Sequence, residues 1–441
     1  MTQQTINELK QFLSIPSIST DPIYQKEIEK CSLFLMNHCQ KIGLKPTKIK
    51  TPGHPCIYAE SNQNKDWPTI LFYGHYDVQP PDPLNQWETP PFTPSIRNGY
   101  IYARGASDDK GQVWAHLKAI EKCLKEKIKI NIKVLIEGEE EIGSPNLTKI
   151  LIDNQKKLNC DHLFISDTPM FNKDQPSICI SLRGLLCAEI SLTGPKQDLH
   201  SGQHGGCVAN PINGLATLIH SLKDEKNKIT IPNFYNEIEK LHTRIQKSLN
   251  QLKFNKKNYQ KELGITQSIG EEKTSILQQR WFRPTLDCNG IIGGYTQEGS
   301  KTIIPNSAST KISMRLVSNQ NPKKIAIEFK KHLKKHCPKG LKLNIKIQAE
   351  APAYQANLNN PIYPIIEKTM KKVFNKQPVY IGEGGSIPIV SQFKKYLKKD
   401  SLLIGFNGPH DAIHSPNERF EIKKLTQGIN FIVEFLKKIQ K

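Results

Sequence analysis

The sequence predicts an α/β fold with a mainly parallel sheet, interrupted by an inserted α+β domain. Short apolar runs such as "PTILFYGHYD", "INIKVLIEGEEE", "DHLFISD" and "SLLIGFNG" end in polar clusters and lead into helical patterns, which is typical of alternating strands and helices. This alternation stops after "SICISLRG". A chain of 441 residues is long enough for two domains with cores of their own.

The insertion is expected from about residue 184 to 352. Its patterns predict, in order, the strand "LCAEISLTG", the helix "NPINGLATLIHSLK", a long polar amphipathic segment and the strand "STKISMRLV". The helix "KKIAIEFKKHLKKH" and the strand "KLNIKIQAEA" follow, and "PIIEKTMKKVF" then resumes the first domain. We therefore expect a first domain of residues 1–183 plus 353–441 and an inserted domain of residues 184–352.

The formal net charge of +21 comes mostly from lysine-rich stretches that are spaced like solvated helix faces. No aromatic-interleaved basic patch or zinc finger accompanies them, so we expect no nucleic-acid partner. A basic nucleic-acid-binding protein whose acidic clusters only cap helices remains the alternative from another class of function.

The chain also lacks an apolar run of eighteen residues and an N-terminal pattern of a basic stretch followed by an apolar one. Its ten cysteines are scattered, without a CxxC pair. These observations predict a cytoplasmic protein with reduced thiols and no membrane partner.

"FYGHYDV" places His75 and Asp77 two residues apart, so both side chains point to the same face of an extended strand. A histidine that binds a metal normally donates its other ring N–H to a carboxylate, and Asp77 is placed to accept it. Taken alone, the motif is equally compatible with a core histidine beside a turn aspartate.

Further acids and a histidine follow other expected strands. Asp108 and Asp109 begin a helical pattern, three consecutive glutamates stand in "EGEEEIGS", Asp167 ends "DHLFISD", and His414 stands in "HDAIHSPNERF". Helix capping explains one or two such acids, but not a cluster at a strand's carboxyl end. In parallel sheets that edge forms the ligand crevice.

Two histidines with three or more carboxylates form an oxygen-rich ligand set that suits a pair of Zn²⁺, Mn²⁺ or Co²⁺ ions. The cations would also offset the repulsion between the acids. We predict two divalent metal ions per subunit, with Zn²⁺ as the first choice and Mn²⁺ or Co²⁺ as alternatives.

Eight motifs in a fixed order resemble one enzyme family: "GHYDVQP", "RGASDDKG", "EGEEEIGS", "ISD", "DLHSGQHGG", "IPNSASTKISMRLV", "GEGGSIP" and "IHSPNERF". They look like the co-catalytic di-metal peptidases, which include carnosinases, cytosolic non-specific dipeptidases, acetylornithine deacetylase, succinyl-diaminopimelate desuccinylase, aminoacylases and glutamate carboxypeptidases. The match runs from near residue 70 to near residue 420.

The resemblance implies a complete ligand set. One metal would be bound by His75 and Asp167, the other by Glu141 and His414, and Asp108 would bridge the two.

The resemblance also implies the chemistry. Asp77 would be the carboxylate partner of His75, and the peptide bond from Asp108 to Asp109 would be cis. Glu140 would be the general base, taking a proton from a water that bridges the two metals. The resulting hydroxide would attack the scissile carbonyl, and Glu140 would return the proton to the departing amine.

The inserted domain and a late loop would complete the pocket. By resemblance, His200 reaches across a dimer interface to stabilise the partner subunit's oxyanion, and Arg315 binds the substrate's terminal carboxylate. Ser386 with Gly384 and Gly385 resembles the family's substrate loop. Each has an ordinary alternative: a loop histidine, an edge-strand charge and a tight turn.

"GHYDVQPP" and "GEGGSIP" resemble the dipeptidase branch more than the deacylases. We therefore predict a homodimeric metallopeptidase that hydrolyses dipeptides or short peptides with a free carboxylate. The alternative is an amide deacylase of the same fold, acting on N-acyl amino acids.

Overall fold

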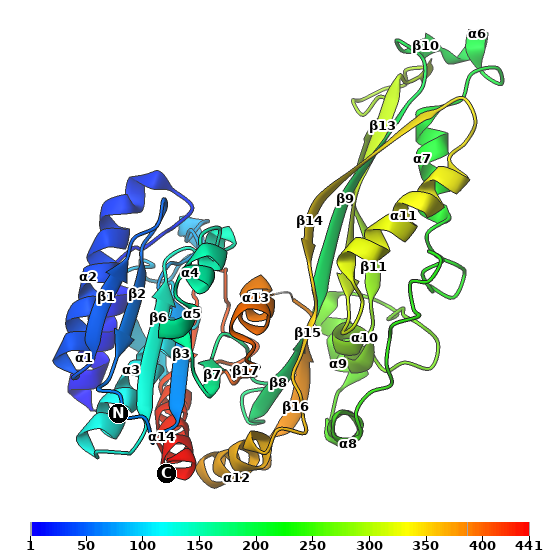
Figure 1. Cartoon of the computed structure of the whole chain (residues 1–441). Helices are drawn as coiled ribbons and strands as arrows, with labels where there is room; N and C mark the ends of the chain where they lie inside the picture. Colours follow the sequence, from blue (N-terminus) through cyan, green and yellow to red (C-terminus); the bar gives the residue numbers. More distant parts are fainter. Residues whose placement is uncertain (1, 386, 441) are drawn as a thin grey trace. The chain divides into compact units, whose positions relative to one another are not determined.

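The computed structural model describes residues 2–385 and 387–440, which fold into two compact units (Figure 1). The first unit comprises the chain up to Ile180 together with Ala356–Ile381 and Gln392–Lys441. The second comprises Ser181–Gln355 and Gly382–Ser391. No helix in the described part of the chain has both the length and the apolar character needed to cross a bilayer.

A large sheet forms the centre of the first unit. Its strand order is β1 (Lys45–Ile49), β2 (Cys56–Glu60), β6 (Asn131–Glu137), β3 (Thr69–His75), β7 (His162–Ile165), β17 (Ser401–Leu403), β8 (Ser177–Leu182) and β15 (Tyr354–Gln355), and β16 (Val379–Glu383) also pairs with β8. The ends of β8 and β16, and all of β15, belong to the second unit. The four central strands β6, β3, β7 and β17 are parallel, which confirms the predicted fold class.

The central strands are buried because their sequences are apolar on both faces, as expected for parallel strands covered by helices. β3 reads "TILFYGH" and β6 reads "NIKVLIE", and nearly every residue in them is buried. The helices of this unit, or beginning at its boundary, are α1 (Gln3–Leu13), α2 (Gln25–Lys41), α3 (Lys110–Lys125), α4 (Leu147–Asp153), α5 (Gln155–Leu158), α12 (Ile362–Phe374), α13 (Pro388–Leu397) and α14 (Ile422–Ile439).

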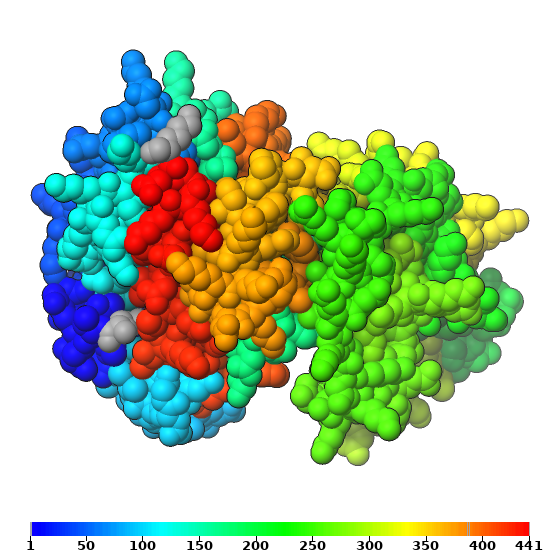
Figure 2. Space-filling model, turned by 90° about the horizontal axis from the view of Figure 1, so that it is seen from below, coloured from blue at the N-terminus to red at the C-terminus, as the bar shows by residue number. Residues whose placement is uncertain are grey.

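Helix α3 packs on β3, α14 packs on α3, and α12 packs on α14. Helices α12 and α14 lie side by side at the surface in Figure 2, with α12 in orange and α14 in red. Short 3₁₀ helices are η1 (Pro22–Tyr24), η2 (Leu84–Gln86) and η3 (Glu140–Ile142), and a small sheet consists of β4 (Ser95–Arg97), β5 (Tyr100–Tyr102) and β18 (Arg419–Glu421).

A buried lysine connects helix α1 to the start of α3. Lys110 is fully buried, and its Nζ donates to the backbone carbonyls of Phe12 (3.3 Å) and Ile15 (2.7 Å). Phe12 O also accepts from the Ile15 N–H (3.4 Å) and Ile15 O from the Ser17 N–H (2.9 Å), so the ammonium is a further donor to each of these carbonyls at and just after the end of α1.

The second unit is built on an antiparallel sheet of order β11 (Thr285–Gly293), β13 (Ser307–Leu316), β9 (Gly184–Thr193) and β14 (Lys342–Ala351). Residues alternate between buried and accessible along β9 and β13, as expected when one sheet face is covered. The buried face, which includes Leu186, Ile190 and Met314, shares a core with α7 (Pro211–His220) and α11 (Pro322–His336).

The remaining elements of the second unit are β10 (Leu199–His200), β12 (Ile303–Ile304), α6 (Ser201–His204), α8 (Thr243–Gln251), α9 (Lys256–Leu263) and α10 (Ile276–Phe282). Helix α10 stands directly before β11. The C-terminal residues of α10, Trp281 and Phe282, are buried.

Candidate metal centre

The carboxyl ends of three neighbouring parallel strands carry the candidate ligands of the first unit. β3 ends at His75, which is paired in register with Glu137 at the end of β6. The glutamates of η3 follow β6, and Asp167 follows β7 two residues after its last residue. Parallel strands place their carboxyl ends at one edge, so these side chains meet there.

Two groups of possible ligands share Asp108. One group is His75, Asp108 and Asp167, the other is Asp108, Glu141 and His414, and the ligand atoms within each group lie within 4.8 Å of one another. His75 Nε2 lies 3.0 Å from Asp108 Oδ1, and His414 Nε2 lies 2.9 Å from Asp108 Oδ2. Each oxygen of Asp108 therefore faces a different imidazole, which is the arrangement of a bridging carboxylate.

The spacing and chemistry of these atoms fit divalent metal ions. Two atoms bound to one zinc ion at about 2.1 Å with tetrahedral angles lie about 3.4 Å apart. His414 Nε2 lies 3.4 Å from Glu141 Oε2, and the other carboxylate oxygen, Glu141 Oε1, is buried without a hydrogen-bond partner among the described residues. Imidazole and carboxylate ligands suit Zn²⁺, Mn²⁺ and Co²⁺.

The two groups differ in their access to solvent. His75 is completely buried, whereas the side chain of His414 is 52% exposed and its backbone adopts a positive φ of 59°. The peptide bond from Asp108 to Asp109 is cis, as the motif resemblance implied.

Asp77 connects one histidine to the glutamate turn. Its Oδ1 lies 3.3 Å from Nδ1 of His75. The other ring nitrogen of His75, Nε2, faces Asp108. The same carboxylate accepts hydrogen bonds from the backbone N–H groups of Glu140 (3.2 Å) and Glu141 (3.0 Å). Asp77 thus orients the candidate ligand His75. It also fixes the backbone of Glu140 and of the candidate ligand Glu141.

Gln79 and Glu418 also hold this site, and the sequence interpretation assigned them no role. Gln79 Nε2 donates to Glu141 Oε2 over 2.8 Å. Glu418 is completely buried and accepts from the backbone N–H groups of Ser107 (2.8 Å) and Asp108 (3.1 Å). Both residues stood inside quoted motifs, but nothing local distinguishes them from surface amides and acids.

Glu418 has two more partners. It accepts from the Gly105 N–H over 3.0 Å and from Arg104 Nη1 over 2.8 Å, and Arg104 is almost completely buried. A buried carboxylate that accepts several backbone N–H bonds and pairs with a guanidinium has its polar atoms satisfied. Glu418 therefore fixes the loop that presents Asp108.

Burial and the neighbouring acids disfavour the charged forms of Glu140 and Asp167, and the acids favour the charged form of His414. Burial raises the pKa of Glu140 well above its ordinary value, and Asp167, Glu141 and Asp108 add to this shift while His75 opposes it. Burial, followed by the charge of Asp108, raises the pKa of Asp167 to about 7. Hydrogen bonds to Asp108 and Glu141 raise the pKa of His414 to about 10. Buried acids at this density call for cations.

The model of the peptidase family M20/M25/M40 matches residues 71–438 of the chain. The chain belongs to this family. The assignment confirms the resemblance that the eight motifs predicted.

Among curated M20 relatives, the Cys-Gly metallodipeptidase dug1 of Schizosaccharomyces pombe is 28% identical, covering 98% of this chain and 94% of that protein. Among solved structures, the M20 family metallo-carboxypeptidase Sso-CP2 from Sulfolobus solfataricus is 34% identical, with a TM-score of 0.87 and 99% of each chain covered. Human carnosine dipeptidase 1 is 27% identical, with a TM-score of 0.80, covering 99% of this chain and 96% of that one.

The other residues predicted for the M20 site belong to the second unit. His200 ends β10, is exposed, and accepts from the N–H of Gly202 through Nδ1 over 3.0 Å. Arg315 is a partly buried residue of β13 opposite Leu185. Gly385 donates its N–H to Glu383 Oε1 over 3.2 Å. Ser386 lies outside the described residues.

We expect Glu418→Gln to weaken metal binding by about 10- to 100-fold, because residues that orient ligands have effects of this size. The amide retains the shape of the side chain but replaces one accepting oxygen with a donor. Chelator competition on the purified protein measures the affinity. Glu421→Gln, three residues further along and partly accessible, should bind metal like the wild type. Unchanged affinity in folded Glu418→Gln protein would contradict the assigned role.

Proposed function

We propose that this M20 peptidase is a metal-dependent dipeptidase that hydrolyses the peptide bond of dipeptides or short peptides. The observation that carries the proposal is the pair of ligand groups sharing Asp108, with Glu140 next to the ligand Glu141. The names of the relatives support the substrate class, since two are called dipeptidases and one a metallo-carboxypeptidase. All three names describe hydrolysis of peptide substrates.

In this proposal His75 and Asp167 hold one divalent ion, Glu141 and His414 hold the other, and Asp108 binds both. Zn²⁺ is the first choice, with Mn²⁺ and Co²⁺ as alternatives that accept the same ligands. When bound, two such ions lower the pKa of a water molecule and polarise a scissile carbonyl.

Glu140 acts as the general base and then as the general acid. Its backbone is fixed by the hydrogen bond from its N–H to Asp77, directly before the candidate ligand Glu141. A carboxylate in this place can take a proton from the attacking water. The proton then passes from Glu140 to the nitrogen of the leaving amine. This transfer completes hydrolysis and returns the Glu140 side chain to its charged form.

We assign catalysis to the domain of residues 1–183 plus 353–441, and lid and dimerisation functions to the inserted residues 184–352. In the inserted domain Arg315 binds the substrate's terminal carboxylate, for which a planar guanidinium is suited. Gly385 and Ser386 belong to the substrate loop.

The same proposal includes a homodimer in which His200 acts on the partner subunit's oxyanion. The edge strand β11 supports an interface, because Ile291 and Ile292 are 61% and 70% exposed there. Exposed apolar side chains on an edge strand favour association with another chain. A cytoplasmic location is supported by the ten cysteines, none of which forms a disulfide bond in the described part of the chain.

A substrate panel tests the reaction class. After chelation and restoration of Zn²⁺, Mn²⁺ or Co²⁺, we expect hydrolysis of unblocked dipeptides at a kcat/KM at least about tenfold above that for acetylated or succinylated amino acids. A preference for the acylated compounds would establish the deacylase alternative. No bound or activating divalent ion, together with salt-sensitive DNA or RNA binding, would favour the nucleic-acid-binding alternative.

We expect Glu140→Ala to lower kcat by about 10²- to 10⁴-fold, the usual contribution of a general base, while metal content stays at two ions per subunit. Elemental analysis and steady-state kinetics measure the two quantities. Glu139→Gln is the matched control, because Glu139 instead accepts from the N–H of His54 and from Asn146. Loss of metal from Glu140→Ala would show that Glu140 is a ligand.

Mixing two inactive variants tests the role of His200. A dimer of one His200→Ala and one Glu140→Ala subunit would contain one complete site if His200 acts across the interface. Random exchange of subunits should then restore about a quarter of wild-type activity. No recovery, with subunit exchange verified by mass spectrometry, would place His200 in its own subunit's site, and an active His200→Ala variant would place it outside catalysis.

A further inference from the structure

We propose that Arg183 is a positioning residue for substrate binding, which holds the loop Gly382–Gly385 to the sheet face that carries Arg315. The inference rests on the proposed function, because that proposal assigns this loop and Arg315 to the substrate. Arg183 stands between β8 and β9, and its Nε donates to the carbonyl of Gly384 over 2.9 Å.

The glycines of the loop allow it to lie close to its support. A Cβ at Gly382 would lie 2.7 Å from the Cβ of Trp281. A Cβ at Gly384 would lie 3.0 Å from Arg183 Nη2 and 3.2 Å from the backbone carbonyl of Arg280. Contacts below 3.4 Å require a neighbour to move, so the guanidinium and helix α10 together leave no room for larger residues here.

Two backbone N–H groups of the loop, which begins within the last two residues of β16, are bound by a side chain of the loop itself. Glu383 Oε1 accepts from the N–H groups of Gly384 (2.7 Å) and Gly385 (3.2 Å). The bond from Arg183 to the Gly384 carbonyl has a different effect, because it connects the loop to a residue about 200 positions earlier in the chain. Arg183 is therefore a hydrogen-bond donor that connects the loop to the start of β9.

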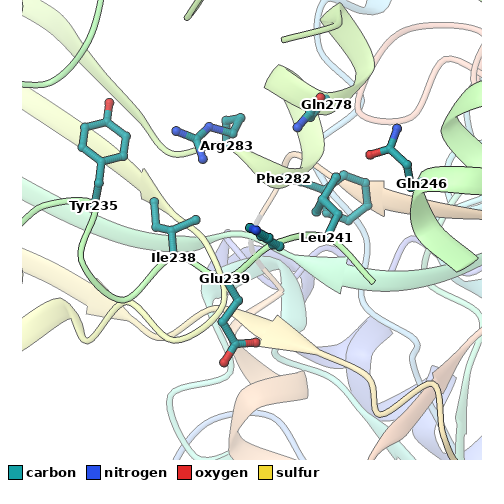
Figure 3. Close-up of a pocket in the computed structure, with 9 residues that line it drawn as sticks. Tyr235, Ile238, Glu239, Leu241, Gln246, Gln278, Phe282 and Arg283 are labelled. Atoms are coloured by element: carbon teal, nitrogen blue, oxygen red, sulfur yellow. The ribbon is translucent and has the colours of Figure 1, made fainter. Parts of the chain in front are cut away.

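Helix α10, which supports the other side of the loop, is itself anchored. Arg283, directly after α10, donates from Nε to Glu271 over 2.6 Å, and the hydroxyl of Tyr235 donates to Glu271 over 2.8 Å. Figure 3 shows Tyr235, Arg283 and Phe282 along a pocket of the second unit. Phe282 also reaches the loop, since its ring carbons lie 3.1 Å from the position of a Cβ at Gly382.

Arg183 and Arg315 share one face of the sheet. Leu185 pairs with Arg315, and Arg183 lies two residues before Leu185 in an alternating pattern of buried and partly buried residues. The two arginines are therefore diagonal neighbours on the face opposite the core. Burial, with the charge of Arg315 next, lowers the pKa of Arg183 to about 10. Adjacent guanidinium groups favour an anionic ligand such as a terminal carboxylate.

The experiment compares Arg183→Gln and Arg183→Lys with Arg280→Gln. Neither replacement at position 183 keeps a planar guanidinium, whereas Arg280→Gln removes a nearby charge and keeps the bond to Gly384. With a dipeptide substrate, both Arg183 variants should raise KM at least about tenfold and keep kcat within about threefold, because the loop binds ground state and transition state alike. Metal content should stay at two ions, and Arg280→Gln should change KM by less than about threefold.

Hydrogen exchange on the substrate-free protein provides a readout that does not depend on activity. The amides of Gly384 and Gly385 should exchange at least about tenfold faster in Arg183→Gln than in the wild type or Arg280→Gln, because the loop is no longer fixed. Unchanged exchange, an unchanged KM, or an equal loss in Arg280→Gln would overturn the proposal. If the wild type cleaved no dipeptide, the proposed function would fail, while the exchange experiment would still decide whether Arg183 holds the loop.

Discussion

Buried carboxylates that hold backbone N–H groups are the interactions on which the metal centre depends. Asp77 fixes the turn of Glu140 and Glu141, and Glu418 fixes the loop of Asp108. Neither acid belongs to the candidate ligand groups. Because both are buried and hydrogen-bonded, they hold the peptide segments that carry the candidate ligands Asp108 and Glu141.

The sequence could point to residues that lie together in the structure because the candidate ligands stand in recognisable local patterns. His75 ends one apolar strand of the parallel sheet and Asp167 follows another, where polar residues are conspicuous and the topology brings the two together. Glu418 could not be found this way, since it binds Ser107 from 311 residues away and resembles any acid near a helix start. Gly382–Ser391 begins within β16, a strand whose first three residues belong to the first unit, and no local signal shows that this segment belongs to the second.

The two units divide the chemistry. The candidate ligands and base belong to the first unit, whereas Arg183, Arg315 and the glycine loop belong to the second. Under the proposed function, changes on the sheet of the second unit would alter which substrates are accepted and would leave the candidate metal ligands in place. This division explains why the motifs predicted the metal chemistry more sharply than the substrate, which depends on contacts between distant residues such as Arg183 and Gly384.

The buried contact of Lys110 makes the N-terminal helix a requirement for the site, although α1 carries none of its residues. Lys110 follows Asp109 directly, and its ammonium donates hydrogen bonds to the backbone carbonyls of Phe12 and Ile15. A chain shortened by its first fifteen residues would leave this ammonium buried without those acceptors, at large energetic cost. Proteolytic trimming at the N-terminus would thus weaken the support of the segment next to Asp108 from a position remote in sequence from every candidate ligand.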